Sequence, residues 1–322
     1  MAFSEFDLIK KFFAGHADRP DVVKGVGDDA AILEVPPNHQ LVVTTDTLIE
    51  GVHFPEQTSA QDIGHKALAV NLSDIAAMGA EPAWATLSLS LPHYDQNWLT
   101  DFAKGFLELA SQFNVALVGG DTVSGPLSIT VQMHGLIPRG TALMRSGAQV
   151  NDLVYVTGTL GDAGLALKNM LEHLSLEPVS FKRLREHLDR PTPRIMEGIA
   201  LRDMATACID ISDGLFADLN HICEESSKGA EIHLEKLPLS SDVEQYIEKS
   251  AAWDIPLSSG DDYELCFTVP ENKSSGINVL FATLGVRCTC IGRITDTGHI
   301  RVLDKNNKEI HINKAGYDHF KK

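Results

Sequence analysis

The apolar and polar positions in the first 80 residues predict two helices and a strand. Ser4 and Asp7 form a capping pair for a helix at the N-terminus, whose apolar residues can share one face. Residues 40–47 predict a buried strand that ends in polar side chains. Ser59 with Asp62 marks the start of a long alanine-rich helix that reaches about residue 78.

Strands and helices continue to alternate up to residue 138. Residues 86–91 alternate strictly between apolar and hydroxyl side chains, which is typical of a half-exposed strand. Residues 95–113 predict an amphipathic helix, and residues 115–122 and 127–138 predict two further strands. This order indicates an N-terminal α+β domain over residues 1–149.

The pattern changes near residue 150, where turn residues precede a β-branched strand and a glycine-spaced turn into a helix. A polar stretch at 184–194, a strand at 207–212, a helix from about Asp213 and three short strands follow. We therefore expect a second, mixed α/β domain over residues 150–322 that completes an active-site cleft.

Length and charge narrow the possible functions. A chain of 322 residues corresponds to about two domains of ordinary size. Its 44 acidic residues outnumber 27 basic ones, giving a net charge of −17, which argues against nucleic acid as a partner. No apolar run approaches a membrane span, and acidic residues in the first ten argue against a secretory signal. We expect a cytoplasmic protein with no membrane partner, whose five cysteines are reduced.

Short aspartate motifs are the main chemical signal. Phosphate-loop, zinc-protease, hydrolase and protein-kinase signatures are absent from the sequence. Instead, aspartates follow glycine or close an apolar strand in five places, and their oxygens suit Mg²⁺, which shares its ligand shell with phosphates. The motifs are Gly27-Asp28-Asp29, Thr44-Thr45-Asp46, Gly119-Gly120-Asp121, Asp210-Ile211-Ser212-Asp213 and Gly260-Asp261-Asp262.

Asp74 is the least ambiguous of the candidate ligands. It lies in a predicted helix that is apolar on nearly every face, and a buried carboxylate without a partner would be costly. We expect a cation beside it, with Asn71 on the same side of the helix as an indirect partner. Gly120 can let backbone amides approach a phosphate, Arg145 can bridge phosphates across the cleft, and His53 can contact a substrate.

Taken in order, these segments resemble the thiamine-monophosphate kinases, a family within the aminoimidazole-ribonucleotide-synthetase-like superfamily of ATP-using enzymes. The resemblance spans nearly the whole chain and rests on GDDAA, TTDTLIEGVHF, KALAVNLSDIAAMGA, GGDT, RSGA, DISDGL and GYDHF. It implies an N-terminal α+β domain that dimerises through a β-barrel, and a C-terminal α/β domain. It also implies phosphorylation of thiamine monophosphate by ATP with several Mg²⁺ ions.

The resemblance assigns roles residue by residue. It implies metal ligands at Asp29, Thr44, Thr45, Asp46, Asp74, Asp121, Asp210 and Asp213. It implies ATP contacts at Gly120, Asp121, Arg145 and Ser212, and thiamine-phosphate contacts at His53, Asp261 and Tyr317. The family usually has Gly-Gly-Glu-Asp where this chain reads Ser259-Gly260-Asp261-Asp262, so the side chain at 261 is one methylene shorter.

This chemistry needs no general base, because the acceptor phosphate is already ionised at neutral pH. We therefore predict direct, in-line transfer without a phosphoenzyme, which labelling of the protein by ATP alone would contradict. Ring synthetases of the same superfamily remain an alternative. The selenium and hydrogenase-maturation members are disfavoured, since the first cysteine is Cys208 and the chain ends Phe320-Lys321-Lys322. A non-catalytic acidic metal-binding protein is the alternative from another class, although no EF-hand loop is present.

Overall fold

The chain divides into two compact units. The computed structural model describes residues 11–13, 19–312 and 316–317, so most of the expected N-terminal helix lies outside the described residues. An N-terminal unit comprises residues 1–75 and 80–140, and a C-terminal unit comprises residues 76–79 and 141–322. The change at residue 140 precedes the boundary expected at 149, because the intervening segment bonds to the C-terminal unit: the Cys208 N–H donates to the Met144 carbonyl at 2.9 Å.

The N-terminal unit is built on an open sheet of four strands, as far as the described residues extend. The strands β3 and β6 are antiparallel, as are β6 and β4, while β4 and β5 are parallel. Because β3 and β5 are edges, the chain by itself does not form the expected barrel. In sheet order the strands are β3 (His39–Ile49), β6 (Ser128–Pro138), β4 (Glu81–Leu91) and β5 (Ala116–Ser124).

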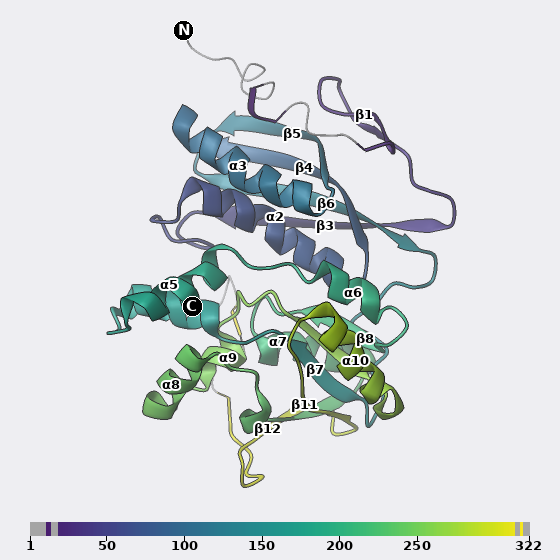
Figure 1. Cartoon of the computed structure of the whole chain (residues 1–322), viewed down its shortest axis with the longest axis vertical. Coiled ribbons are helices and arrows are strands. Elements are labelled where there is room, and N and C mark those ends of the chain that lie inside the picture. The colour runs from purple at the N-terminus through teal and green to yellow at the C-terminus, as the bar shows by residue number, and fades with distance from the viewer. Residues whose placement is uncertain (1–10, 14–18, 313–315, 318–322) are drawn as a thin grey trace. The chain divides into compact units, whose positions relative to one another are not determined.

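Two helices, α2 (Ala60–Ala77) and α3 (Gln96–Gln112), lie side by side against this sheet (Figure 1). Both helices have N-terminal caps, and the sequence indicated the one at Ser59. The Asp62 N–H donates to Ser59 Oγ at 3.2 Å, and Asp95 accepts hydrogen bonds from the first turn of α3. A hairpin of β1 (Val22–Lys24) and β2 (Ile32–Leu33) packs its apolar side chains on a cluster around Trp84.

The two helices cross at a pair of glycines. A Cβ on Gly64 would lie 2.1 Å from the Phe102 carbonyl oxygen, and one on Gly105 would lie 1.9 Å from that of Gln61. The backbones of α2 and α3 therefore touch, and no larger residue fits at either position. This close approach fixes α2 directly against α3.

Strand β4 has the half-exposed pattern that the sequence predicted, whereas β3 differs from the buried strand that was expected. The Leu residues of 86–91 are buried, so the hydroxyl residues form the open side of β4. Strand β3 is not buried: Leu41, Val43 and Ile49 are 45%, 50% and 41% exposed. These alternate positions face away from α2, since the positions between them include Thr44, which bonds to a residue of that helix.

The C-terminal unit contains a mixed sheet of six strands in the described part of the chain. All neighbours are antiparallel except β12 and β9. In sheet order the strands are β12 (Ile300–Leu303), β9 (Gly229–His233), β11 (Cys288–Thr295), β7 (Leu153–Thr157), β10 (Leu265–Val269) and β8 (Ala207–Asp210). The helices are α4 (Asp162–Glu172), α5 (Pro178–Asp189), α6 (Ile195–Leu201), α7 (Leu215–Ser226), α8 (Ser241–Ser250), α9 (Asp254–Ser258) and α10 (Ser274–Leu284).

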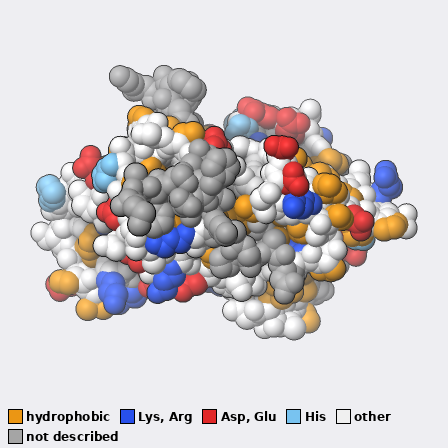
Figure 2. All heavy atoms as spheres, turned by 90° about the horizontal axis from the view of Figure 1, so that it is seen from above, with side chains coloured by type: hydrophobic (Ala, Val, Ile, Leu, Met, Phe, Trp, Pro, Cys, Tyr) orange, Lys and Arg blue, Asp and Glu red, His pale blue; other side chains and the backbone are white. Residues whose placement is uncertain are grey.

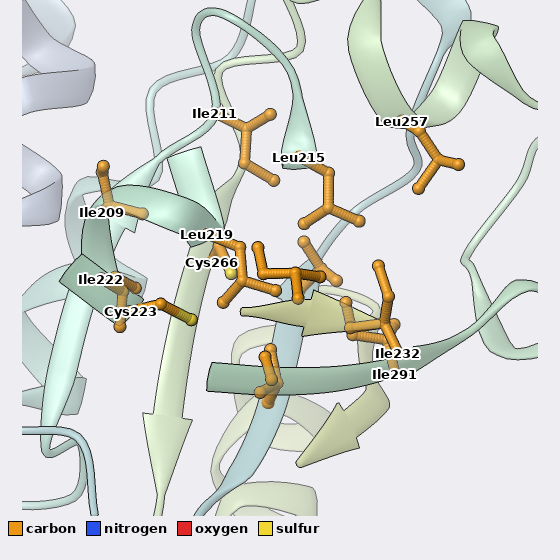
Figure 3. Close-up of a cluster of buried hydrophobic side chains, with 14 of the residues drawn as sticks. Ile209, Ile211, Leu215, Leu219, Ile222, Cys223, Ile232, Leu257, Cys266 and Ile291 are labelled. Atoms are coloured by element: carbon orange, nitrogen blue, oxygen red, sulfur yellow. The ribbon is translucent and has the colours of Figure 1, made fainter. Parts of the chain in front are cut away.

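Helices cover both faces of this sheet. Figure 3 shows Leu215, Leu219 and Ile222 of α7 gathered with Ile232 and Ile291 from the strands. On the other face, Phe281 of α10 stacks on Phe267, whose ring in turn stacks on Tyr155. Helix α5 occupies part of the stretch expected only to be polar, because Leu184 and Leu188 give it one buried face.

The surface carries charges of both signs. Figure 2 shows acidic and basic side chains interspersed on the face that it draws. Among the described residues, helices that could span a membrane are absent.

The glycine crossing generates a stability prediction. Gly105→Ala should lower the free energy of unfolding by about 1–3 kcal/mol, because the added methyl forces α2 and α3 apart. Helix propensity alone would favour alanine by about 1 kcal/mol. Gly276→Ala in α10 is the control, since its Cβ would meet only the flexible end of Met204, at 2.9 Å. Urea denaturation measures the free energy of unfolding of each variant. Equal changes in this free energy for Gly105→Ala and Gly276→Ala would contradict the close crossing.

Candidate active site

In the N-terminal unit, a carboxylate cluster joins β3 to α2. Thr44 and Asp46 alternate along β3 and face the helix, where the Thr44 hydroxyl donates to Asp74 Oδ2 at 2.5 Å. The side chains of Asp46 and Asp74 also share a hydrogen bond. This arrangement gathers three oxygen-bearing side chains from two elements that are 30 residues apart in sequence.

The electrostatics of this cluster favour a bound cation. Burial, followed by the charge of Asp74 and the hydrogen bond to it, raises the pKa of Asp46 to about 7. Two carboxylates held together in this way repel each other when both are ionised. A divalent cation between them would remove that repulsion, and oxygen ligands of this kind suit Mg²⁺. The donor set therefore fits the metal that the sequence indicated.

Asn71 supports this cluster from within α2. It is fully buried, its Nδ2 donates to the Ala67 carbonyl at 3.1 Å, and its Oδ1 accepts from the Asp46 N–H at 3.2 Å. The structure therefore brings Asn71 to the backbone of Asp46, and its role as an indirect partner of a cation at Asp74 stays a prediction. Thr45 lies between Thr44 and Asp46 on β3, so strand alternation directs its side chain to the opposite face.

His53 lies just after β3 and is fixed through its ring. Its Nδ1 accepts from the Ile49 N–H at 3.0 Å, so Nε2 carries the proton of the neutral ring. Its backbone carbonyl accepts from Lys66 Nζ at 3.2 Å. The orientation of the imidazole is therefore determined by the turn that follows β3.

Asp29 and Asp121 are not gathered around the Asp46–Asp74 pair. Within the described ranges, the structure shows no group of three or more His, Cys, Asp or Glu side chains that could hold a metal ion. Asp29 is exposed in the segment between β1 and β2. The sheet register aligns Asp121 with Ser88, which is exposed, whereas Asp46 aligns with the buried Val131.

Gly120 lies within a strand, as the pattern of residues 115–122 predicted. Strand β5 continues through it to Ser124, and its φ is 153°. A Cβ there would lie 1.9 Å from the Leu87 carbonyl oxygen of β4. The glycine is therefore required by the close approach of two strands, which the sequence pattern could not reveal.

In the C-terminal unit, the segment after β8 carries Ser212 and Asp213, and a single carboxylate holds it in place. Asp218 of α7 is 3% exposed, and its Oδ2 accepts from the N–H groups of Ser212, Asp213 and Gly214 at 3.0, 3.0 and 3.1 Å. Burial, then the charge of Asp213, raises the pKa of Asp218 to about 7. Asp210, at the end of β8, is also buried.

The same segment brings the expected substrate residues together. The Asp261 N–H donates to the Ser212 carbonyl at 2.9 Å, and the Tyr317 N–H donates to the Asp213 carbonyl at 3.2 Å. Asp261 and Tyr317, which are 56 positions apart by their numbers, therefore flank one short segment. Asp210, Ser212 and Asp213 lie on that segment or at its start.

Arg145 belongs to the C-terminal unit and is exposed. Ser226, the last residue of α7, fixes the backbone around it: the Ser226 hydroxyl donates to the Arg145 carbonyl at 3.4 Å and accepts from the Ala148 N–H at 3.1 Å. The guanidinium is thus presented from an anchored segment.

The comparisons with known proteins match both halves of the chain. Residues 27–137 match the family model "AIR synthase related protein, N-terminal domain", and residues 149–305 match "AIR synthase related protein, C-terminal domain". The thiamine-monophosphate kinase of Escherichia coli K12 is 46% identical, over 99% of each chain. The chain belongs to the thiamine-monophosphate kinase family.

Solved structures agree with this assignment. The thiamine-monophosphate kinase of Stenotrophomonas maltophilia is 46% identical with a TM-score of 0.87, and the match covers 94% of this chain and 97% of that one. The structure of AaThiL complexed with AMPPCP and TMP is 34% identical with a TM-score of 0.78, covering 98% and 96%. The E. coli hydrogenase maturation protein HypE, at 20% identity and a TM-score of 0.80, shares the fold.

Sequence reasoning missed Asp218, Glu264 and Arg194, which hold the candidate segments in place. It named Asp262 only as part of the Gly260-Asp261-Asp262 motif, without its bond to Gly161. Asp218 had a readable signal, because it lies among Leu215, Leu219 and Ile222 on a helix, as Asp74 lies among apolar residues. Glu264 had no such signal. Its partners are 70 and 107 positions away, and no local pattern connects them.

The role of Asp218 generates the next prediction. Asp218→Ala leaves three N–H groups without their acceptor and should lower the free energy of unfolding by about 2–4 kcal/mol. Asp218→Asn keeps an acceptor oxygen and should recover much of the loss. Glu224→Ala, on an exposed turn of the same helix, should change stability by less than about 1 kcal/mol. Equal losses for Asp218→Ala and Glu224→Ala would refute this role.

Proposed function

We propose that this chain transfers the γ-phosphoryl group of ATP to thiamine monophosphate, giving thiamine diphosphate and ADP. The 46% identity to the Escherichia coli thiamine-monophosphate kinase over 99% of both chains carries this conclusion. In the reaction a phosphate oxygen of thiamine monophosphate forms a bond to the γ-phosphorus of ATP. The bond from that phosphorus to the β,γ-bridging oxygen breaks, and ADP leaves with the electron pair.

The ligands named for AaThiL support both substrates. AMPPCP is an ATP analogue in which a methylene replaces the β,γ-bridging oxygen, and TMP in a thiamine-monophosphate kinase is thiamine monophosphate. A complex with a non-cleavable donor and the acceptor together is consistent with direct transfer between them. At 34% identity over nearly the whole of both chains, the same pair suits this chain.

Mg²⁺ is the proposed metal, and the Asp46–Asp74 pair is its best-supported site. When bound, the ions would neutralise phosphate charge and stabilise the transition state. The remaining proposed ligands come from the family resemblance: Asp29, Thr44, Thr45, Asp121, Asp210 and Asp213. Strand alternation directs the Thr45 side chain away from Asp74, so its assignment as a ligand rests on the resemblance alone.

The substrate contacts are also proposals from the resemblance. ATP is assigned to Gly120, Asp121, Arg145 and Ser212, and the thiamine phosphate to His53, Asp261 and Tyr317. Thiamine has a cationic thiazolium ring and an aminopyrimidine, so a carboxylate at 261 and an aromatic ring at 317 are complementary to it. An exposed guanidinium at 145 suits a phosphate.

The reaction requires positioning more than proton transfer. The acceptor oxygen of thiamine monophosphate is ionised at neutral pH, so no side chain has to remove a proton from it. The residues of this chain therefore act by binding and orienting two anions, which would otherwise repel. We assign no general base and expect no phosphoenzyme.

The active form is proposed to be a homodimer. Strands β3 and β5 are the edges of the N-terminal sheet, and the apolar row of Leu41, Val43 and Ile49 on β3 is about half exposed. A second copy would pair with an edge and cover this row, which removes both an open edge and an apolar surface from water. The barrel implied by the family resemblance would then form from two chains.

The activity is tested by ADP release from the purified protein with ATP and Mg²⁺. Thiamine monophosphate should support turnover, whereas thiamine or no acceptor should not. Asp74→Asn should lower kcat/KM by at least about 100-fold, because the carboxylate pair loses one charge. Asp62→Asn, in the first turn of the same helix, should retain activity within about threefold. Turnover that is independent of the acceptor or of Asp74 would contradict the proposal.

Sedimentation velocity tests the dimer. The unchanged protein should sediment as a dimer at micromolar concentration, and Val43→Lys should shift it to a monomer by placing a charge in the apolar row. Val279→Lys is the matched control, because Val279 is 68% exposed on α10 in the other unit. If the unchanged protein sediments as a monomer, the proposed homodimer is wrong.

A further inference from the structure

The segment of residues 259–263, between α9 and β10, has an unusual backbone. Gly260, Asp261 and Tyr263 have φ values of 72°, 62° and 48°. This left-handed conformation is unfavourable for residues other than glycine, although aspartate tolerates it better than most. Such a conformation persists only when the surrounding structure fixes it. The contacts of the segment therefore show what determines the direction of the Asp261 side chain.

One side of the segment is held by backbone hydrogen bonds. The Asp261 N–H donates to the Ser212 carbonyl, and the Tyr263 N–H donates to the Ile211 carbonyl at 2.8 Å. The Ile211 N–H in turn donates to the Glu264 carbonyl at 2.8 Å. These bonds extend the pairing of β8 with β10. These bonds attach residues 259–263 to the segment after β8. They form only when Glu264 is held in place at the start of β10.

Glu264 is fixed from three directions. Its side chain is 8% exposed and accepts two hydrogen bonds from Arg194. Arg194 Nε donates to Oε2 at 2.6 Å, and Arg194 Nη2 donates to Oε1. Its Oε2 also accepts from the Thr157 hydroxyl at 2.6 Å, and Thr157 Oγ1 accepts from the Leu265 N–H at 2.8 Å. A Cβ on Gly158 would lie 1.9 Å from Glu264 Oε1, so only glycine leaves room for this carboxylate.

The chemistry of this network suits positioning better than stabilisation. A buried ion pair contributes little net stability, because desolvation offsets the attraction. A guanidinium that bonds a carboxylate through two nitrogens does fix direction, since both groups are planar. Asp262, next to Asp261, accepts from the Gly161 N–H at 2.9 Å and so ties the segment to the turn before α4.

We propose that Arg194, Glu264 and Thr157 form a positioning network that aims the Asp261 carboxylate at the thiamine substrate and thereby sets the affinity for it. This inference rests on the proposed function, because it takes Asp261 as a contact of thiamine monophosphate. An aspartate has a shorter side chain than the glutamate usual in the family, so its reach depends more strongly on the backbone. None of the three residues of the network is assigned a substrate contact.

Steady-state kinetics of the full-length protein test the network through Arg194→Lys. Lysine keeps the charge but loses the two-nitrogen bond. The KM for thiamine monophosphate should rise about tenfold, while kcat and the KM for ATP stay within about twofold. Arg183→Lys is the control, because Arg183 also donates through two nitrogens to a carboxylate, that of Asp242 on α8, but with its side chain 55% exposed. Equal rises in KM for the two variants would overturn the proposal.

Thr157 supplies a second pair of variants should Arg194→Lys fail to fold. Thr157→Val removes the hydroxyl at nearly constant volume and should raise the same KM, whereas Thr157→Ser keeps the hydroxyl and should restore it to within about twofold. A purely structural role would instead give both variants similar kinetics and different unfolding temperatures. That result would overturn the proposal.

A double-substitution cycle separates positioning from an independent effect. If Arg194 acts through Asp261, Arg194→Lys should add nothing to the KM for thiamine monophosphate once Asp261→Ala is present. Additive effects of the two substitutions would mean that Arg194 acts by another route, and would overturn the proposal.

Amide hydrogen exchange gives a readout that does not depend on activity. The N–H groups of Asp261 and Tyr263 should exchange about tenfold faster in Arg194→Lys and unchanged in Arg183→Lys. Unchanged exchange in Arg194→Lys would overturn the positioning role. A different result is faster exchange in Arg194→Lys together with an unchanged KM for thiamine monophosphate in both Arg194→Lys and Asp261→Ala. That result would show that Asp261 does not contact the substrate, and it would overturn the substrate role of the network as well.

Discussion

The structure depends on how carboxylates withdrawn from water are compensated. Asp218 receives three backbone N–H groups, Glu264 receives a guanidinium and a hydroxyl, and Asp262 receives the N–H of a glycine turn. Each of these acids fixes a segment of the C-terminal unit. The Asp46–Asp74 pair is different in kind, because its two members face each other and the charge of one raises the pKa of the other. A divalent cation would compensate such a pair, and the proposed phosphoryl transfer would use that cation.

Much of the fold could be predicted because its elements carry local signals. The Ser59 cap, the alanine-rich helix and the alternation at 86–91 are patterns within a few residues, and the structure has α2 and β4 there. The exposure of β3 could not be predicted from a local pattern. The alternating row of Leu41, Val43 and Ile49 fits any strand, and the sequence does not show whether water or another strand covers it.

Candidate site residues could be predicted where a charged residue lies among apolar neighbours in the sequence. Asp74 on an apolar helix could be singled out because burial of a charge is costly, and the structure places it against Thr44 and Asp46. The close approach that requires glycine at 120 was not visible in the sequence, since it comes from the Leu87 carbonyl of a neighbouring strand. Roles set by long-range contacts, such as that of Glu264, become visible only when the strands are paired.

The central claim is that the Asp46–Asp74 pair holds a divalent cation, and calorimetric titration with Mg²⁺, with and without ADP, tests it most directly. The unchanged protein and Asp62→Asn should bind Mg²⁺ alike. Asp46→Asn and Asp74→Asn should each weaken binding by at least about tenfold, because each removes a charged ligand. Equal affinities of all four proteins for Mg²⁺ would contradict the account.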